Sequence, residues 1–290
     1  MQEAHAARDG ASAAAHVRPP LKVGVWVDDA FPQIDSRYLE RLKACGITEV
    51  ALMTNRMNAT SSAPPFELRS PEETIVRVAQ MFRLAGFEVV LTCWPRPSRG
   101  QIVALHGSMR DLMRDSGAVA LEVDAEANWT PRFLDGFATM EHAAAHLVDC
   151  LRDAARGRRV EMTTFAQHGE NARGADLAPL VDCVFPQAYS VTERGGKVIP
   201  WDHPYGPGRM QTLTHERAVQ SGARSVGFGL AAYEQRFAGH DPRVAMRVAL
   251  ERSRELGVDH VRYWSSKWIV GARGTSWARA AITEATRTAL

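Results

Sequence analysis

The sequence predicts a single (β/α)8 barrel, an α/β architecture also called the TIM barrel. Three observations lead to this fold class: β-type and helical segments alternate, there are eight of each, and residues typical of helix ends separate them. Strict alternation of this kind is typical of a closed parallel barrel. A doubly wound open sheet is the alternative, but the first strand is followed by Val27-Asp28-Asp29-Ala30-Phe31 instead of a glycine-rich phosphate-binding turn.

Each expected element has a local reason. Segments rich in β-branched and aromatic residues predict strands at 21–27, 49–53, 88–93, 118–123, 160–165, 183–188, 225–230 and 260–264. Apolar residues with helical spacing predict helices at 36–45, 72–85, 102–115, 140–155, 175–181, 212–221, 242–256 and 275–289. Ser70-Pro71-Glu72-Glu73 is typical of a helix start. Gly46, Gly86, Gly117 and Gly257 are typical of helix ends.

Composition is that of a globular enzyme with one large core. The chain has 290 residues, of which 45% are hydrophobic and 23% charged, and its formal net charge is +2. This balance favours neither a nucleic-acid partner nor membrane insertion, and no segment has the length of a membrane span. We expect a monomer, with residues 1–20 as a flexible alanine-rich tail and residues 21–290 as the catalytic barrel.

Targeting, cysteine and metal signals are weak. The tail lacks the apolar core of a signal peptide, so we expect synthesis in the cytoplasm, with release or delivery to the cell wall by another route. The four cysteines, Cys45, Cys93, Cys150 and Cys183, show no CxxC pairing and are interpreted as small buried thiols. His142 and His146 lie four residues apart but lack the internal acid of a zinc-hydrolase helix, so no metal or other cofactor is expected.

The fourth predicted strand ends in closely spaced acids. Glu122, Asp124 and Glu126 alternate along the chain, so their side chains would lie on one face about 7 Å apart. Like charges this close raise one another's pKa on a buried face, which favours acid/base chemistry. The alternative is an edge strand with a solvated acidic face.

Carboxyl ends of barrel strands converge on one site, so the residues there are candidates for function. They are Asp28, Asp29, Trp94, Arg96, Asp124, Glu126, Asn128, Trp129, Gln167, His168, Gln187, Tyr189, Tyr233, Glu234, Gln235, Trp264, Ser265, Ser266, Lys267 and Trp268. Carboxylates among amides and aromatic rings indicate a sugar-binding site. The long connection 191–210 carries Trp201 and Tyr205, and it is expected either to form a substrate wall or to pack its rings against one another.

Short motifs resemble two families of barrel glycosidases. Val123-Asp124-Ala125-Glu126, Phe185-Pro186-Gln187-Ala188-Tyr189, Tyr263-Trp264 and the aspartate after strand one resemble family-25 lysozymes. The strand-four acids are also similar to those of family-18 chitinases, which alternate and end in a catalytic glutamate. Glu122 and Val119 stand where the chitinase pattern has aspartates, and the first strand lacks the usual opening of the lysozymes.

The resemblance implies a hydrolase that cuts β-1,4 bonds beside N-acetylated sugars, with peptidoglycan as the first expected polysaccharide and chitin as the next. It implies Glu126 as general acid, Asp124 and Tyr189 as contacts for the 2-acetamido group, and Asp28 as support for charge developing on the ring. Further substrate contacts would be Gln187, Trp264, Trp94, Asp29, Glu234, Trp201, Tyr205 and Trp129.

Two alternatives remain open at this point. Glu234 could be a carboxylate nucleophile with Glu126 as acid/base, which requires the two carboxyl groups to lie about 5 Å apart. A barrel that binds glycan without cutting it would use the same aromatic walls, because fold alone does not decide function.

Overall fold

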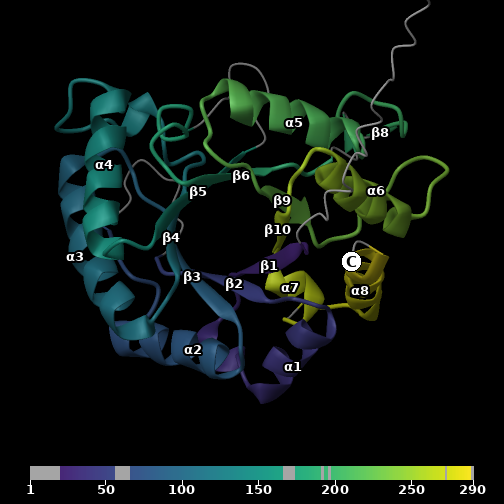
Figure 1. Cartoon of the computed structure of the whole chain (residues 1–290), viewed down its shortest axis with the longest axis horizontal. Helices are drawn as coiled ribbons and strands as arrows, with labels where there is room; N and C mark the ends of the chain where they lie inside the picture. Colours follow the sequence, from purple (N-terminus) through teal and green to yellow (C-terminus); the bar gives the residue numbers. More distant parts are fainter. Residues whose placement is uncertain are drawn as a thin grey trace, which may run out of the picture.

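The computed structural model describes residues 20–55, 66–165, 174–190, 193–194, 197–271 and 273–288, and it confirms the predicted closed barrel. Eight parallel strands form the barrel in chain order, and β1 pairs with β10 to close it (Figure 1). They are β1 (Lys22–Val27), β2 (Glu49–Met53), β3 (Glu88–Cys93), β4 (Ala120–Asp124), β5 (Arg159–Phe165), β6 (Cys183–Gln187), β9 (Phe228–Ala231) and β10 (His260–Trp264). Two short strands, β7 (Glu193–Arg194) and β8 (Lys197–Val198), pair in the connection after β6.

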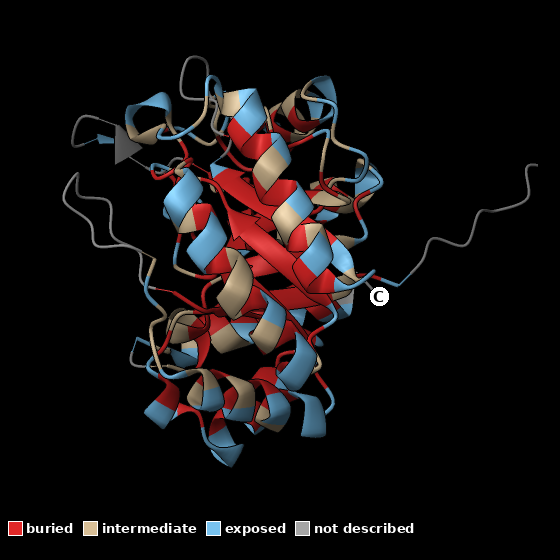
Figure 2. Cartoon of the chain, turned by 90° about the vertical axis from the view of Figure 1, so that its left-hand side faces the viewer, coloured by how far each residue is buried: buried red, intermediate tan, exposed pale blue. Residues whose placement is uncertain are grey.

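Helices surround the barrel (Figure 1). They are α1 (Ser36–Ala44), α2 (Glu72–Leu84), α3 (Arg99–Ser116), α4 (Met140–Ala155), α5 (Arg209–Gln220), α6 (Pro242–Glu255), α7 (Ser266–Ile269) and α8 (Ser276–Thr288). Their inner faces are buried against the strands and their outer faces are exposed (Figure 2). None of these described helices combines the length and the apolar character that a membrane crossing needs.

The helix predicted at 175–181 is wrong, because residues 175–180 form turns. Pro179 would fall in the interior of that helix, where it lacks an N–H group and clashes with the preceding turn. Leu177, Ala178 and Val181 are nevertheless buried. Their apolar spacing therefore reflected burial of an irregular segment and not helical structure.

Alternation along the strands divides the buried residues into two sets. One set, which includes Val25, Leu52 and Leu91, packs outward against the helices. The other points into the barrel and includes Trp26, Ala51, Val90, Ala120 and Phe185. All five residues of β4 are buried, and a closed barrel has no edge strand, so the solvated acidic face considered for β4 is wrong.

Candidate active site

Asp124 and Glu126 form the acidic centre of the candidate site. Asp124 is the last residue of β4, is 2% exposed, and its Oδ1 atom has no hydrogen-bond partner within the described part of the chain. Burial, followed by the charges of Glu126 and Glu122, holds the pKa of Asp124 well above its usual range. Burial also raises the pKa of Glu126, while a hydrogen bond to its carboxylate acts in the opposite direction. The pair therefore favours retaining a proton, as a general acid requires.

The hydrogen bond to Glu126 comes from β6. Gln187, the last residue of β6, donates from Nε2 to Oε1 of Glu126. Tyr189 follows two residues later, and its buried hydroxyl has no partner among the residues described. Burial is the main reason why the pKa of Tyr189 lies well above its usual range, and the nearby Tyr233, Glu126 and Asp124 add to it. Tyr189 is therefore a protonated donor near the two acids.

Asn128 fixes the backbone on which the acids lie. Its Oδ1 accepts a hydrogen bond from the Glu126 backbone N–H at 2.8 Å, and its Nδ2 donates to the Asp124 carbonyl at 2.9 Å and to the Pro95 carbonyl. Thr164 Oγ1 donates to the Ala125 carbonyl at 2.8 Å. The turn after β4 is thus tied to β5 and to the segment after β3.

Aromatic and charged residues at or just after the ends of β1, β3 and β10 lie at the same end of the barrel, because the carboxyl ends of parallel barrel strands lie together. Trp264 ends β10, is half-buried, and forms a cis peptide bond with Ser265. Lys267 Nζ lies 5.5 Å from the centre of the Trp264 ring and 2.5 Å from Oδ2 of Asp28. Trp94 is buried, and its Nε1 has no partner in the described ranges. Its free N–H could donate to a ligand.

Three predicted contact residues instead bind protein groups. Asp29 Oδ2 accepts hydrogen bonds from Tyr38 and Ser266, each at 2.8 Å. Trp129 lies in the core at 1% exposure and donates to Asp176 at 2.9 Å. Glu234 is exposed and pairs with Arg236 at 3.1 Å. None of these contacts involves Asp124 or Glu126.

The rings of the long connection after β6 also pack within the protein. Trp201 stacks on His240 with ring centres 4.2 Å apart and meets the edge of Phe237 at 5.5 Å. Tyr205 lies beside His203, with ring centres 5.3 Å apart. The Tyr205–His203 contact fits the alternative in which the rings of the connection pack against one another, whereas the partners of Trp201, Phe237 and His240, lie outside the connection.

Gln167 and His168 lie outside the described residues. Within the described part, no group of three or more histidine, cysteine, aspartate or glutamate side chains is arranged to hold a metal ion. All four cysteines are free; Cys45 and Cys93 are buried, whereas Cys150 and Cys183 are half-buried.

Sequence reasoning placed Glu122 on the face of Asp124 but missed its partners beneath the site. Glu122 lies inside the barrel, where it contacts Trp26, Thr92 and Arg262. A signal was present, because charged residues at alternate positions of otherwise apolar strands must either pair inside a barrel or face solvent.

The comparisons with known proteins show a similarity in fold to solved structures. No family model matches the sequence. One segment of 100 residues is 38% identical to L-seryl-tRNA(Sec) selenium transferase from Geotalea uraniireducens (strain Rf4), and it spans 34% of this chain and 20% of that protein. This short match covers too little of either chain to assign a family.

Solved structures match nearly the whole chain at low sequence identity. The catalytic domain of the Pyrococcus furiosus chitinase superposes with a TM-score of 0.61 at 14% identity, covering 94% of this chain and 97% of that one. The GH18 chitinase ChiB of Flavobacterium johnsoniae gives 0.55 at 11% identity, covering 92% and 94%. The spore cortex-lytic enzyme SleL of Bacillus cereus gives 0.56 at 9% identity, covering 91% and 75%. The chain shares the barrel fold of these glycoside hydrolases, and their descriptions agree with the family-18 resemblance more than with the family-25 resemblance.

Proposed function

We propose that this chain is a glycoside hydrolase that cleaves β-1,4 bonds next to N-acetylated sugars. The observation that carries the proposal is geometric: the buried Asp124, whose Oδ1 has no partner among the described residues, lies two residues from Glu126, which accepts a hydrogen bond from Gln187. Burial raises the pKa of both carboxyl groups. A glutamic acid that stays protonated near neutral pH can donate its proton to a glycosidic oxygen. Glu126 is the general acid in this assignment.

The unpartnered polar atoms around Glu126 suit an acetamide group. Asp124 Oδ1 can accept a hydrogen bond from the acetamide N–H, and the Tyr189 hydroxyl can donate one to its carbonyl oxygen. Oriented in this way, the carbonyl oxygen attacks the anomeric carbon while the glycosidic oxygen leaves with the proton of Glu126. The Glu126 carboxylate then takes a proton from the water that opens the cyclic intermediate.

Glu234 does not suit the role of a carboxylate nucleophile. Its side chain is 42% exposed and is engaged by Arg236. A nucleophile of a retaining glycosidase must instead lie about 5 Å from the acid/base carboxyl group, on the other side of the bond to be cut. The acetamide mechanism is therefore favoured over attack by Glu234.

The substrate that we propose first is peptidoglycan, with chitin as the alternative. Trp264 provides an aromatic face for a sugar ring. The ammonium group of Lys267 lies beside that face and is 30% exposed. Lys267 also pairs with Asp28, so the carboxylate of N-acetylmuramic acid would share this cation with Asp28. The structural similarity to a cortex-lytic enzyme and to chitinases supports both polymers.

The test is digestion of purified peptidoglycan and of chitin oligomers, followed by mass analysis of the new reducing ends. The wild type is compared with Glu126→Gln, Asp124→Asn and a matched surface control, Glu141→Gln, which lies exposed on α4. We expect reducing ends on N-acetylmuramic acid with the wild type and the control, and a loss of at least about 100-fold in rate in the two site variants.

The outcomes separate the candidate functions. Cleavage of chitin alone would move the substrate to chitin. Cleavage that survives in Glu126→Gln would refute the assignment of the acid. If the wild type binds either polymer but cuts neither, the chain is a glycan-binding barrel and the proposed activity is wrong.

A further inference from the structure

The segments after β3 and β4 carry three arginines stacked on two phenylalanines. The guanidinium carbons of Arg96 and Arg132 lie 4.1 and 4.9 Å from the centre of the Phe133 ring. That of Arg99 lies 4.6 Å from the centre of the Phe137 ring. Such stacking fixes the plane of a guanidinium group and leaves its N–H groups able to bind an anion. These five residues are called the arginine cluster below.

Backbone hydrogen bonds join the two segments that carry the cluster. The Asp135 N–H donates to the Pro97 carbonyl, and the Arg99 N–H donates to the Asp135 carbonyl, each at 3.0 Å. The Asp135 carboxylate is engaged by Ser98, whose hydroxyl donates to it at 3.1 Å. Gly136 has a φ of 71°, and a Cβ there would lie 2.9 Å from that of Arg99. A glycine is therefore needed for this close approach, and the arginines extend from a fixed framework.

The cluster adjoins the turn that carries the acids. Arg96 directly follows Pro95, and the Asn128 side chain donates to the Pro95 carbonyl and accepts from the Glu126 backbone N–H. The rest of the cluster lies at or near the start of α3 and ahead of α4, and these helices follow the carboxyl ends of β3 and β4. The cluster thus lies on the same side of the barrel as the candidate site. A polymer bound at Glu126 can extend over it.

An open cavity of about 630 Å³ continues the cluster away from the acids. Arg99 and Phe137 line it together with His142 and His146 of α4, and no acidic side chain is among its described lining residues. The Phe137 and His146 rings lie 5.4 Å apart. Both α3 and α4 begin beside it, and the N-terminal end of a helix favours negative charge. The cavity is therefore suited to an anionic group.

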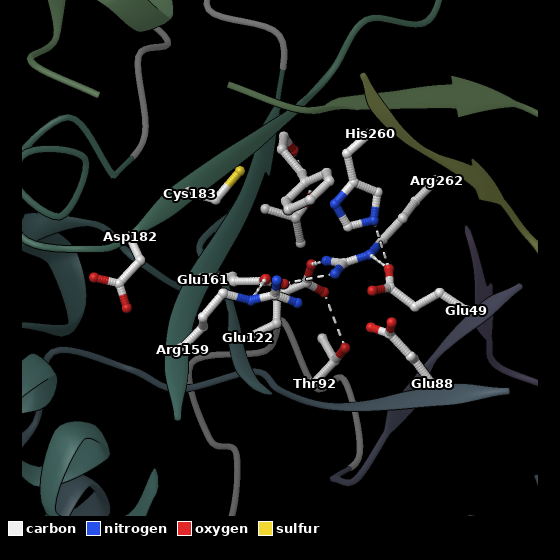
Figure 3. Close-up of polar contacts among 12 residues, drawn as sticks. Glu49, Glu88, Thr92, Glu122, Arg159, Glu161, Asp182, Cys183, His260 and Arg262 are labelled. Atoms are coloured by element: carbon white, nitrogen blue, oxygen red, sulfur yellow. Dashed lines mark hydrogen bonds and ion pairs between the residues drawn. The ribbon is translucent and has the colours of Figure 1, made fainter. Parts of the chain in front are cut away.

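The positive charge of the cluster is not balanced within the protein. Across the described ranges, no carboxylate lies within ion-pair distance of Arg99 or Arg132. The buried Arg262 differs in this respect, because it pairs with three glutamates inside the barrel (Figure 3). Arg96 is 5% exposed, and burial, followed by the charge of Arg132, lowers its pKa. Two like charges at one ring repel, and an anion bound between them relieves that repulsion.

We propose that the arginine cluster binds carboxylate groups carried by the glycan and so selects an acidic polysaccharide over a neutral one. The inference rests on the proposed function and deepens it by naming the substrate class. A guanidinium group binds a carboxylate through two parallel hydrogen bonds, and a chitin chain offers no carboxylate. In peptidoglycan the carboxylate belongs either to the lactyl group of the sugar or to the attached peptide. Both sources share the chemistry that the cluster recognises.

The test measures binding apart from cleavage, by calorimetric titration of the full chain carrying Glu126→Gln. Three soluble ligands with equal numbers of sugars are compared: a chitin oligomer, peptidoglycan strands freed of peptides, and strands that keep them. At about 50 mM salt we expect at least one type of acidic strand to bind more tightly than the chitin oligomer. This advantage should shrink at about 500 mM salt, because salt screens exposed charges.

Variants of the exposed arginines test the assignment, each in the same background. Arg132→Gln and Arg99→Gln should each lower the preference for the acidic strand, measured as a ratio of Kd values, by about threefold to tenfold. Arg132→Lys should keep part of the preference, because an ammonium group retains the charge but not the planar fork. Arg77→Gln is the matched control: it removes an exposed arginine from α2 and should leave the ratio unchanged.

The outcomes decide both the proposal and the source of the carboxylate. Tight binding of peptide-free strands assigns the carboxylate to the lactyl group, and tight binding only of strands with peptides assigns it to the peptide. Equal Kd values for neutral and acidic ligands at low salt would overturn the proposal, as would a preference that both Arg132→Gln and Arg99→Gln retain. If the wild type cuts glycan without any such preference, the proposed function stands and this inference fails. If the preference is found but nothing is cut, the reverse holds.

Discussion

Gln187 donates a hydrogen bond to Glu126, and this contact joins the end of β6 to the turn after β4. The bond occupies Oε1 of Glu126 and so leaves Oε2 as the oxygen that can carry a transferable proton. It also opposes the effect of burial on the pKa of Glu126, because a hydrogen-bond donor directed at a carboxylate favours the ionised form. Gln187 therefore both orients the acid and limits how far its pKa rises.

Replacing Gln187 with Met should expose both effects. Met has a similar length but no N–H donor, so the pKa of Glu126 should rise further and the alkaline limb of the pH–rate profile should move to higher pH. The maximal rate should fall by about tenfold or more because the carboxyl group is no longer oriented. The pH dependence of kcat/KM on soluble oligosaccharide measures the shift. An alkaline limb that stays in place would show that Gln187 does not act on the acid's ionisation.

Replacing Asn128 with Ala should release the turn that carries the acids. Three hydrogen bonds are lost, and the buried backbone carbonyls of Asp124 and Pro95 lose a donor. We expect the free energy of unfolding to fall by about 1–3 kcal/mol, with a larger proportional loss of activity than this destabilisation explains. Urea unfolding and turnover are measured on the same preparation. Full activity in a destabilised variant would limit Asn128 to a structural role.

The sequence predicted the barrel well because its signals are local. The bounds of β2, β3 and β10 coincide with the β-branched runs at 49–53, 88–93 and 260–264. Residues 175–180 form turns where the sequence predicts a helix, because apolar spacing in a short segment indicates burial and not backbone conformation. Asp28 and Asp29 follow β1, which ends at Val27, so strand alternation could not distinguish them; the hydrogen bonds of Asp29 to Tyr38 and Ser266 do.

The candidate site was predicted only in part, for a physical reason. Asp124, Glu126 and Gln187 could be placed together because all three lie at or just after strand ends. The contacts of Arg262 join residues from four strands, and they depend on how the closed barrel staggers those strands. No local pattern specifies that stagger.

Replacing Glu234 with Gln should leave catalysis unchanged. The Glu234 side chain is 42% exposed and pairs with Arg236, and an exposed ion pair contributes little to stability. We expect kcat/KM within about twofold of the wild type and an unchanged unfolding midpoint. A nucleophile would instead lose several orders of magnitude in rate. Steady-state kinetics on the same oligosaccharide decides, and a collapse of kcat would restore Glu234 as the nucleophile.

His260 should make the stability of the barrel depend on pH. Burial lowers the pKa of His260 below its usual value, although the contact with Glu49 opposes this effect. Its folded pKa is therefore below its unfolded value of about 6.5, so the unfolded chain takes up the proton first as the pH falls. The free energy of unfolding should be unaffected by His260 above that value and should decrease as the pH falls below it.

The carboxyl groups of Asp124 and Glu126 contribute with the opposite sign, because their raised pKa values let the folded protein bind protons first. A comparison with His260→Gln removes this complication, since both proteins keep the acid pair. The Gln side chain can still donate to Glu49 but does not titrate. The free energy of unfolding of His260→Gln, relative to that of the wild type, should therefore increase as the pH falls from about 7 to about 5. Urea unfolding at several pH values measures the difference. Parallel stability curves for the two proteins would mean that His260 does not resist protonation inside the barrel.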